Sequence, residues 1–411
     1  MTQFYEQVKE RMIRYAKVDT QSSNHSKTVP TTMKQFDLAR MLYEELKQIG
    51  CSDVWLDEEK CVVYGKIKAN AEGKPLGLVA HMDTAPDASG ANVKPWVLEN
   101  YDGGDIVLNK EQNIFMKAGD YDNLSMYIGQ DLILTDGTTL LGGDDKASIS
   151  AIMTFAEYVI AHSEIKHGLI SIAFTPDEEV GGLARDLDLE RFESPVAYTL
   201  DGDHLGYYED ETFNASQANI HLKGISVHTG TAKGIMKNAV DIGTEFLSRL
   251  PKYEKPQYTD GREGFYHAVS FSATCETGEI VMIIRDHDAL HFAQREDYLR
   301  KVTEALQNEY GKECIELEIV PTYRSMKEVI DQVPWMMDNL IEAIKACGIK
   351  AQSLAFRGGT DGSALSQRGL PSPNLSAGYE NAHGRFEYVP VQSMEKNVEI
   401  LLKLAEICAR G

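Results

Sequence analysis

The chain has 411 residues, enough for two domains of ordinary size. Its composition, with 43% hydrophobic and 25% charged residues, is that of a soluble globular protein. The formal net charge of −22 at pH 7 repels nucleic acids and anionic membrane surfaces, so we expect neither as a partner.

Apolar runs and cysteines indicate the cellular compartment of the protein. Residues 1–17 carry charged side chains and no apolar stretch typical of a secretory signal. The longest apolar runs, such as 76–80 and 280–284, are far shorter than the roughly 20 residues of a membrane helix. The six cysteines are scattered without a Cys-x-x-Cys pair, which is typical of reduced thiols. We therefore expect a cytoplasmic protein.

Segments of helix and strand character alternate along the first 200 residues. They are the helices 4–18, 33–49 and 149–160 and the strands 54–56, 62–67, 76–80, 169–174 and 196–200. Residues 84–130 lack strong periodicity and are rich in Gly, Asp and Asn, which indicates a long functional excursion. The alternation predicts an α/β sheet, and such sheets bind ligands at the carboxyl ends of their strands.

The pattern changes at residue 214 and returns near residue 323. Apolar and polar residues alternate over 217–224, as in a half-exposed antiparallel strand. The segments that follow are the helices 232–250 and 291–310 and the strands 268–276, 279–286 and 315–320. We therefore predict an α/β domain with a mixed sheet, formed by 1–213 and 322–411, and an inserted α+β domain over 214–321.

The stretch 135–147 places two adjacent carboxylates, Asp144 and Asp145, just before the predicted helix 149–160. Neighbouring acids repel each other unless a positive group lies beside them. Lys146 can supply part of that charge, and a metal ion would supply more. The alternative interpretation is a helix N-cap with a second acid at the positive end of the helix.

Two further pairs follow predicted strands. His81 closes one strand, and Asp83, two residues on, faces the same way, so its carboxylate can fix the tautomer of a metal-bound histidine. Glu178 and Glu179 follow another strand, and their side chains diverge, so one can bind a metal while the other faces a metal-bound water. A histidine in a polar turn and a solvated acidic turn are the alternative interpretations.

Asp201 and His383 complete the set of candidate ligands. Asp201 follows a strand and His383 lies in a loop, where each could also be an ordinary turn or loop residue. Together the chain offers two histidines and three acidic strand or turn ends, and two metals that share one bridging carboxylate need five such ligands. Mixed histidine and carboxylate sites suit zinc, whereas Mg²⁺ prefers oxygen.

Five motifs resemble the peptidase T family of tripeptide aminopeptidases. That family belongs to the dizinc metallopeptidases that include carboxypeptidase G and acetylornithine deacetylase. The motifs are His-Met-Asp-Thr-Ala-Pro-Asp at 81–87, Leu-Gly-Gly-Asp-Asp-Lys-Ala at 141–147, Thr-Pro-Asp-Glu-Glu-Val-Gly at 175–181, Arg-Gly-Gly-Thr-Asp-Gly at 357–362 and His-Gly-Arg at 383–385. The resemblance covers essentially the whole chain.

The resemblance implies a zinc-aminopeptidase-like catalytic domain with two Zn²⁺ ions per subunit. The implied ligands are the bridging Asp144, then His81 and Asp201 for one ion, and Glu179 and His383 for the other. Glu178 is the implied general base, and Asp83 the residue that orients His81. The family also implies a cis peptide bond between Asp144 and Asp145.

The inserted segment 214–321 resembles the lid domain of the family. By that resemblance His228 helps to stabilise the oxyanion, often from the partner subunit in relatives, so a homodimer through this domain is one expected assembly. Asn238, Arg285 and Arg357 match positions that bind the C-terminal carboxylate of the substrate, a task that suits the bidentate geometry of arginine. A turn histidine and structural salt bridges are the alternative interpretations.

The sequence therefore predicts a zinc-dependent aminopeptidase that releases the N-terminal residue of tripeptides by attack of a metal-activated water. Another amide hydrolase of the same scaffold, such as a dipeptidase, a carboxypeptidase or an N-deacylase, is the nearest alternative. A peptide- or zinc-binding protein without turnover and a Mg²⁺-dependent phosphoryl-transfer enzyme are alternatives from other classes. Histidine ligands and the lack of a phosphate-cradling Gly-rich motif disfavour the last.

Overall fold

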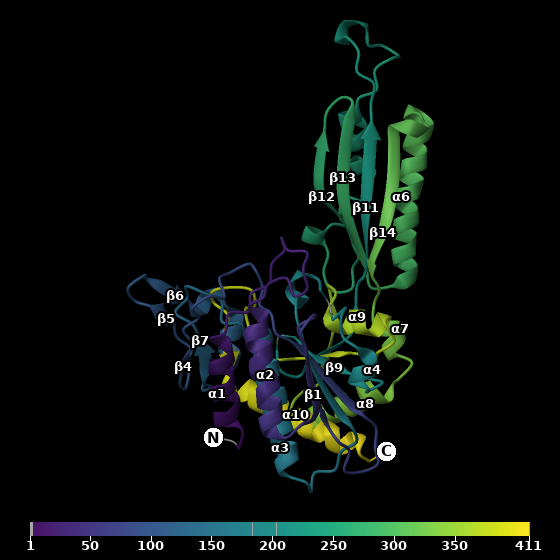
Figure 1. Cartoon of the computed structure of the whole chain (residues 1–411). Coiled ribbons are helices and arrows are strands. Elements are labelled where there is room, and N and C mark those ends of the chain that lie inside the picture. Colours follow the sequence, from purple (N-terminus) through teal and green to yellow (C-terminus); the bar gives the residue numbers. More distant parts are fainter. Residues whose placement is uncertain (1–2, 183, 203, 411) are drawn as a thin grey trace. The chain divides into compact units, whose positions relative to one another are not determined.

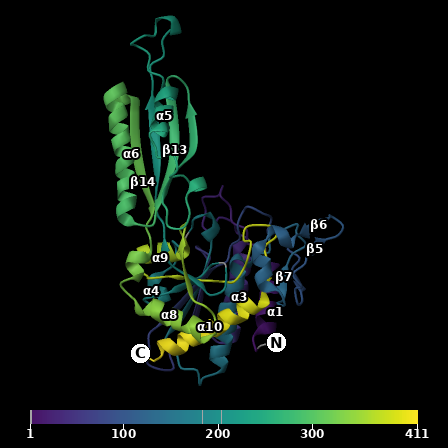
Figure 2. The same cartoon turned by 180° about the vertical axis from the view of Figure 1, so that it is seen from behind.

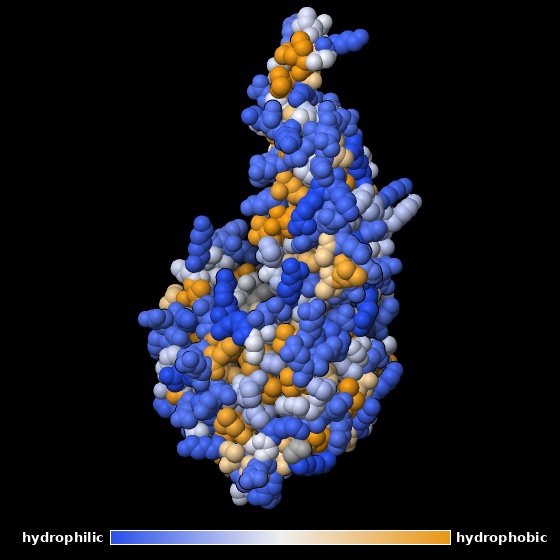
Figure 3. All heavy atoms as spheres, turned by 90° about the vertical axis from the view of Figure 1, so that its right-hand side faces the viewer, coloured by the Kyte–Doolittle hydropathy of each residue, from blue (hydrophilic) through white to orange (hydrophobic). Residues whose placement is uncertain are grey.

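The computed structural model describes residues 3–182, 184–202 and 204–410 (Figure 1). The chain divides into two compact units. Unit 1 comprises Met1–Asp210, Glu328–Leu354 and Thr360–Gly411, and unit 2 comprises Glu211–Lys327 and Ala355–Gly359. Across the described ranges, no helix combines the length and the apolar character needed to cross a bilayer. On the face drawn in Figure 3, hydrophilic residues predominate and hydrophobic residues form scattered patches.

Unit 1 is built on a sheet of eight strands in the order β1-β2-β8-β3-β9-β16-β10-β15. Their bounds are β1 (Ser52–Asp57), β2 (Val62–Ile67), β3 (Leu76–His81), β8 (Ile170–Thr175), β9 (Tyr198–Leu200), β10 (Tyr207–Thr212), β15 (Gln352–Phe356) and β16 (Asn374–Leu375). The central strands β8, β3, β9 and β16 are parallel, whereas β2 pairs antiparallel with β1 and β8, and β10 pairs antiparallel with β16. The predicted mixed α/β sheet is confirmed.

Strands β3 and β8 consist only of buried residues, which is why each reads as a continuous apolar run. The helices of unit 1 are α1 (Tyr5–Ala16), α2 (Gln35–Ile49), α3 (Gly143–Ala161), α4 (Leu189–Phe192), α7 (Lys327–Ile330), α8 (Trp335–Ala346), α9 (Asp361–Gln367) and α10 (Val391–Cys408). Helix α3 packs against α1, α10 and β3, and every residue from 143 to 156 is buried. Figure 2 shows α8 beside α10 in the same unit.

The excursion between β3 and α3 contains short strands that the sequence did not reveal. Strands β4 (Trp96–Leu98) and β7 (Leu132–Leu134) of this excursion form a three-stranded sheet with β17 (Val389–Pro390) from near the end of the chain, and β5 (Ile106–Asn109) pairs with β6 (Ile114–Met116). Two to four residues are too few for a period of two to stand out from the local sequence. These strands enclose a small core of their own.

Unit 2 contains a four-stranded antiparallel sheet in the order β12-β13-β11-β14 with two helices. The bounds are β11 (Asn214–Lys223), β12 (Phe265–Ala273), β13 (Thr277–Asp286), β14 (Ile315–Tyr323), α5 (Ala239–Ser248) and α6 (Ala289–Tyr310). Ala218, Ile220 and Leu222 are buried and alternate with more exposed neighbours, so the predicted α+β architecture is confirmed. The predicted helix over 232–250 is too long at its start, because Asn238 caps the helix.

Candidate metal centre

The carboxyl ends of three parallel strands bring the first site residues together. His81 is the last residue of β3 and pairs with Thr175, the last residue of β8. The short 3-10 helix η3 (Glu178–Val180) follows β8, and Asp201 follows β9. Asp144 enters from the start of α3, where its backbone is non-helical, with φ −75° and ψ 100°.

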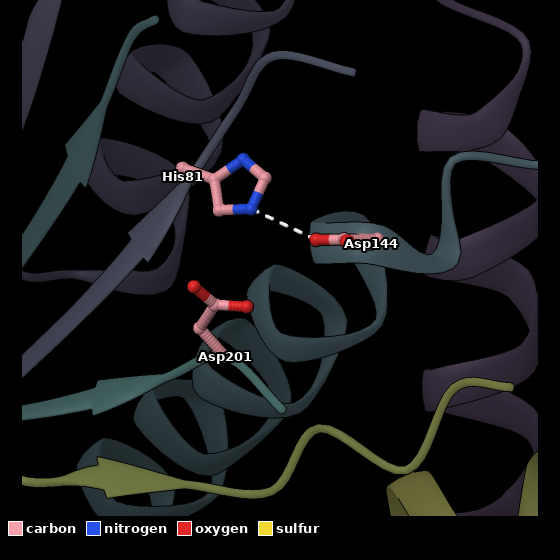
Figure 4. Close-up of side chains that lie close together, drawn as sticks. All are labelled: His81, Asp144 and Asp201. Atoms are coloured by element: carbon pink, nitrogen blue, oxygen red, sulfur yellow. Dashed lines mark hydrogen bonds and ion pairs between the residues drawn. The ribbon is translucent and has the colours of Figure 1, made fainter. Parts of the chain in front are cut away.

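His81, Asp144 and Asp201 form one cluster in unit 1, and their side chains converge on one space in Figure 4. Nε2 of His81 lies 2.9 Å from Oδ1 of Asp144. One ligand atom from each of the three residues lies within 4.8 Å of the others. His81 and Asp144 are only 2% and 7% exposed. A buried imidazole with two carboxylates has the ligand chemistry of a divalent metal site.

Asp144, Glu179 and His383 form a second cluster that shares Asp144 with the first. Nε2 of His383 lies 2.8 Å from Oε2 of Glu179 and 3.3 Å from Oδ2 of Asp144. The two oxygens of Asp144 therefore face different histidines, Oδ1 toward His81 and Oδ2 toward His383. One carboxylate that faces two ligand groups in this way can bridge two cations.

The electrostatics of the clusters fit a bound cation. Hydrogen bonds to Asp144 and Glu179 raise the pKa of His383 to about 11. Burial raises the pKa of Glu179 to about 8, and the charge of Asp144 adds to this shift. Burial disfavours the charged form of Asp144, but hydrogen bonds to His383 and His81 outweigh it and lower the pKa of Asp144. The carboxylates thus depend on positive charge beside them.

One further observation fits a cation at the second cluster. Oε1 of Glu179 is buried, and among the described residues no hydrogen-bond partner faces it. A buried carboxylate oxygen without a partner is costly unless a proton or a metal ion compensates it. The donors around Asp144 are imidazole nitrogens and carboxylate oxygens, a set that zinc accepts.

Asp83 is fully buried and links the end of β3 to the turn after β8. Its Oδ1 lies 3.4 Å from Nδ1 of His81. Its carboxylate also accepts hydrogen bonds from the backbone N–H groups of Glu178 at 3.0 Å and Glu179 at 3.2 Å. Burial raises the pKa of Glu178 well above its ordinary value, with the charge of Asp201 as the next cause.

The peptide bond between Asp144 and Asp145 is cis, as the resemblance predicted. Asp145 is fully buried, and its Oδ2 accepts a hydrogen bond from the backbone N–H of His81 at 3.2 Å. Two consecutive side chains at the start of α3 therefore contact the end of β3, Asp144 at the imidazole and Asp145 at the backbone of His81.

Two buried carboxylates at the site escaped the sequence reasoning. Asp361 accepts a hydrogen bond from Oγ1 of Thr175 at 2.8 Å, and burial raises its pKa to about 7. Glu387 accepts hydrogen bonds from three backbone N–H groups of the loop that carries Asp144. The available signals were positional, since Asp361 lies inside one of the five motifs and Glu387 lies four residues beyond His383.

The four predicted substrate-binding residues belong to unit 2. His228 is exposed, and its ring accepts a hydrogen bond from a backbone N–H two residues on. Asn238 accepts a backbone hydrogen bond as the N-cap of α5. Arg285 donates to two backbone carbonyls and lies over the ring of Tyr323, and Arg357 donates to carbonyls between β11 and β12. Their role toward a substrate stays a prediction.

A cavity of about 250 Å³ in unit 1 adjoins the first cluster. Asp201 forms part of its wall, together with His204, Tyr207 and Tyr208. Leu354 adds an apolar surface.

The chain is similar to curated proteins over its whole length. It is 48% identical over 404 residues to a protein named peptidase T from Clostridium botulinum strain Hall, which covers 98% of this chain and 99% of that protein. It is 46% identical over 402 residues to a peptidase T from Caldanaerobacter subterraneus subsp. tengcongensis, with 97% and 98% covered. Residues 211–314 match a family model described as the peptidase dimerisation domain.

Solved structures share the fold. The aminopeptidase PepT from Bacillus cereus superposes with a TM-score of 0.77 at 20% identity, covering 98% of this chain and 99% of that chain. A tripeptidase from Staphylococcus aureus gives a TM-score of 0.76 at 24% identity with 99% of both chains covered. A dinuclear metal-binding peptidase of the M20 family from Bacillus subtilis gives 0.68 at 13% identity, again with 99% of both covered. On its 48% identity over nearly the full length of a relative, the chain belongs to the peptidase T family.

Proposed function

We propose that this chain is a metal-dependent aminopeptidase that removes the N-terminal residue of tripeptides. The observation that carries the proposal is the position of Asp144, whose two oxygens face two separate histidines within two clusters of ligand type. The full-length relatives named peptidase T and the shared fold of a protein described as a tripeptidase support the same activity.

We infer two Zn²⁺ ions per subunit. Their ligands are the bridging Asp144, with His81 and Asp201 for one ion and Glu179 and His383 for the other. When bound, the ions lower the pKa of a water molecule toward neutral and polarise the peptide carbonyl. Asp83 holds the imidazole of His81 from its other nitrogen, which keeps Nε2 directed at Asp144.

Glu178 acts as the general base in this proposal. It takes a proton from the attacking water and passes it to the nitrogen of the leaving amine. The hydrogen bond from its backbone N–H to Asp83 supports the role, because it fixes the place of Glu178 beside the cluster.

The inserted domain, 214–321, acts as a lid in this proposal. His228 stabilises the oxyanion, and Asn238, Arg285 and Arg357 bind the C-terminal carboxylate of the peptide. The match of 211–314 to a peptidase dimerisation domain supports a homodimer through this domain. All six cysteines are free thiols, which supports work in the cytoplasm.

A substrate panel tests the proposal. The purified chain is loaded in turn with Zn²⁺, Co²⁺ and Mn²⁺ and offered free tripeptides, dipeptides, N-acetylated tripeptides and N-acyl amino acids. We expect release of the first residue from free tripeptides and little from their acetylated forms, because an aminopeptidase requires the free α-amine. Equal rates on acetylated and free tripeptides would contradict the proposal and favour another amide hydrolase of the same fold.

A further inference from the structure

A single hairpin carries both His383 and the buried side chain of Glu387. The backbone groups of Glu380 and Tyr388 exchange two hydrogen bonds, at 2.9 and 3.1 Å, and close the hairpin below these residues. Directly after it, β17 pairs with β7, the strand that leads into the loop of Asp144. The hairpin and the loop of Asp144 therefore start from one pair of strands.

Glu387 bridges the two segments where they separate. Its Oε2 accepts hydrogen bonds from the backbone N–H groups of Leu141 at 2.8 Å and Gly142 at 2.7 Å, and its Oε1 accepts one from Asp144 at 2.9 Å. Glu387 is 2% exposed, so no solvent replaces these contacts. Hydrogen bonds to a carboxylate are about twice as strong as those between neutral groups.

The packing around this carboxylate is too close to admit a side chain at residue 143. A Cβ atom on Gly143 would lie 3.1 Å from Oε1 of Glu387 and 2.5 Å from Cγ2 of Val389. Glycine at 143 therefore lets the hairpin lie directly against the start of α3. Glu387 and Asp144, which are joined in this way, are 243 residues apart in sequence.

We propose that Glu387 is a positioning residue that holds the bridging Asp144 at a fixed distance from His383. Because His383 belongs to the same hairpin, the cluster of Asp144, Glu179 and His383 depends on Glu387 more strongly than the cluster of His81, Asp144 and Asp201. The inference rests on the proposed two-metal function. It adds a residue that touches neither metal nor substrate and acts through the backbone of the bridging ligand.

A glutamine at 387 tests this idea with little change of volume. Its side chain has one oxygen and one NH₂ group, and an NH₂ group cannot accept a hydrogen bond. If the amide oxygen accepts the hydrogen bonds from Leu141 and Gly142, the backbone N–H of Asp144 faces the NH₂ group, which is another donor. Loss of such outer contacts typically weakens metal binding by about 10- to 100-fold.

Metal-free wild type and Glu387→Gln are dialysed against a series of free Zn²⁺ concentrations, and the bound metal is counted by elemental analysis. Co²⁺ titration followed by visible absorption reports the coordination of each ion. We expect two tight ions in the wild type. In the variant we expect one tight ion and a second ion bound about 10- to 100-fold more weakly, with a changed Co²⁺ spectrum for that ion only.

Glu395→Gln is the matched control, because Glu395 is another glutamate of unit 1 with 2% exposure, on α10. It should bind both ions as the wild type does. Wild-type affinities in Glu387→Gln, or equal weakening in Glu395→Gln, would overturn the inference. Should Glu387→Gln not fold, Glu387→Asp decides by the same criterion, since its shorter side chain cannot span both sets of N–H groups. Fewer than two ions in the wild type would instead overturn the two-metal proposal.

Discussion

At the scale of single residues, Asp144 is the group on which both clusters depend. Its Oδ1 lies 2.9 Å from Nε2 of His81, and its Oδ2 lies 3.3 Å from Nε2 of His383. The site can therefore hold two cations only while both atoms are acceptors. This requirement separates Asp144 from the terminal ligands, each of which serves one cluster.

Replacement of Asp144 by asparagine should remove at least one bound ion. The amide offers one oxygen ligand and one NH₂ group, so it cannot bridge. Elemental analysis of the purified variant measures the loss. Asp136→Asn, a change at a loop acid bound to Lys94 and Thr138, should keep both ions. Two fully bound ions in Asp144→Asn would rule out the bridging role.

Replacement of Glu178 by glutamine should lower kcat by about 10²- to 10⁴-fold, the usual contribution of a general base. The metal content should not change, because the neighbouring Glu179 is the proposed ligand. Steady-state kinetics and metal analysis of the same preparation make the comparison. The exposed Glu164 provides a control, since Glu164→Gln should keep the wild-type rate. Full activity in Glu178→Gln would remove it from the mechanism.

At the scale of elements, the start of α3 lies against β17 with no spare room. A Cβ on Gly143 would come within 2.5 Å of Val389. Gly143→Ala should therefore cost about 1–3 kcal/mol of stability, as overpacking of a core commonly does. Urea unfolding measures the change. Gly119→Ala, where nothing lies within 4 Å of the added atom, is the control. Equal stabilities of the two variants would refute the close packing.

Unit 2 contains a buried histidine that should make the stability of the fold depend on pH. His287 is 7% exposed, and burial lowers its pKa to about 4. Arg262 and Arg357 act in the same direction, whereas Asp286 opposes it, and Glu211 lies 3.5 Å from the ring. The folded state thus binds the proton less well than the unfolded chain, with an ordinary pKa near 6.5.

Because the unfolded chain binds this proton more tightly, the stability of the fold is complete above about pH 6.5 and falls as the pH drops toward 4. Between pH 7 and pH 5 the expected loss is about 2 kcal/mol. Urea unfolding of the wild type and of His287→Gln at both pH values measures this contribution as the difference between the two proteins. The exposed His291 serves as the control, because His291→Gln should leave the difference intact. The same change of stability between the two pH values in the wild type and in His287→Gln would contradict the assignment.

The elements that position the site differ in how far the sequence reveals them. β3 and β8 are buried along their whole length, so their apolar runs and the polar residues after them could be predicted. The three-residue strand β7 could not, because its pattern is too short. The contacts of Glu387 join segments 243 residues apart, and no local pattern marks the acceptor of a distant backbone N–H group.

At the scale of the whole molecule, the chain combines a net charge of −22 with a buried cluster of carboxylates that needs positive charge. The described part of unit 1 supplies five candidate ligand groups from five separate stretches of sequence, among them the start of α3. The sheet brings His81, Glu179 and Asp201 together, because the parallel strands β3, β8 and β9 end at one edge.

The most direct test of this account is a crystal structure of the zinc-loaded chain with anomalous diffraction measured on both sides of the zinc absorption edge. We predict two anomalous peaks in each chain on either side of Asp144, one bound by His81 and Asp201 and the other by Glu179 and His383. A single peak, or zinc bound away from Asp144, would contradict the central claim that this carboxylate bridges a pair of catalytic ions.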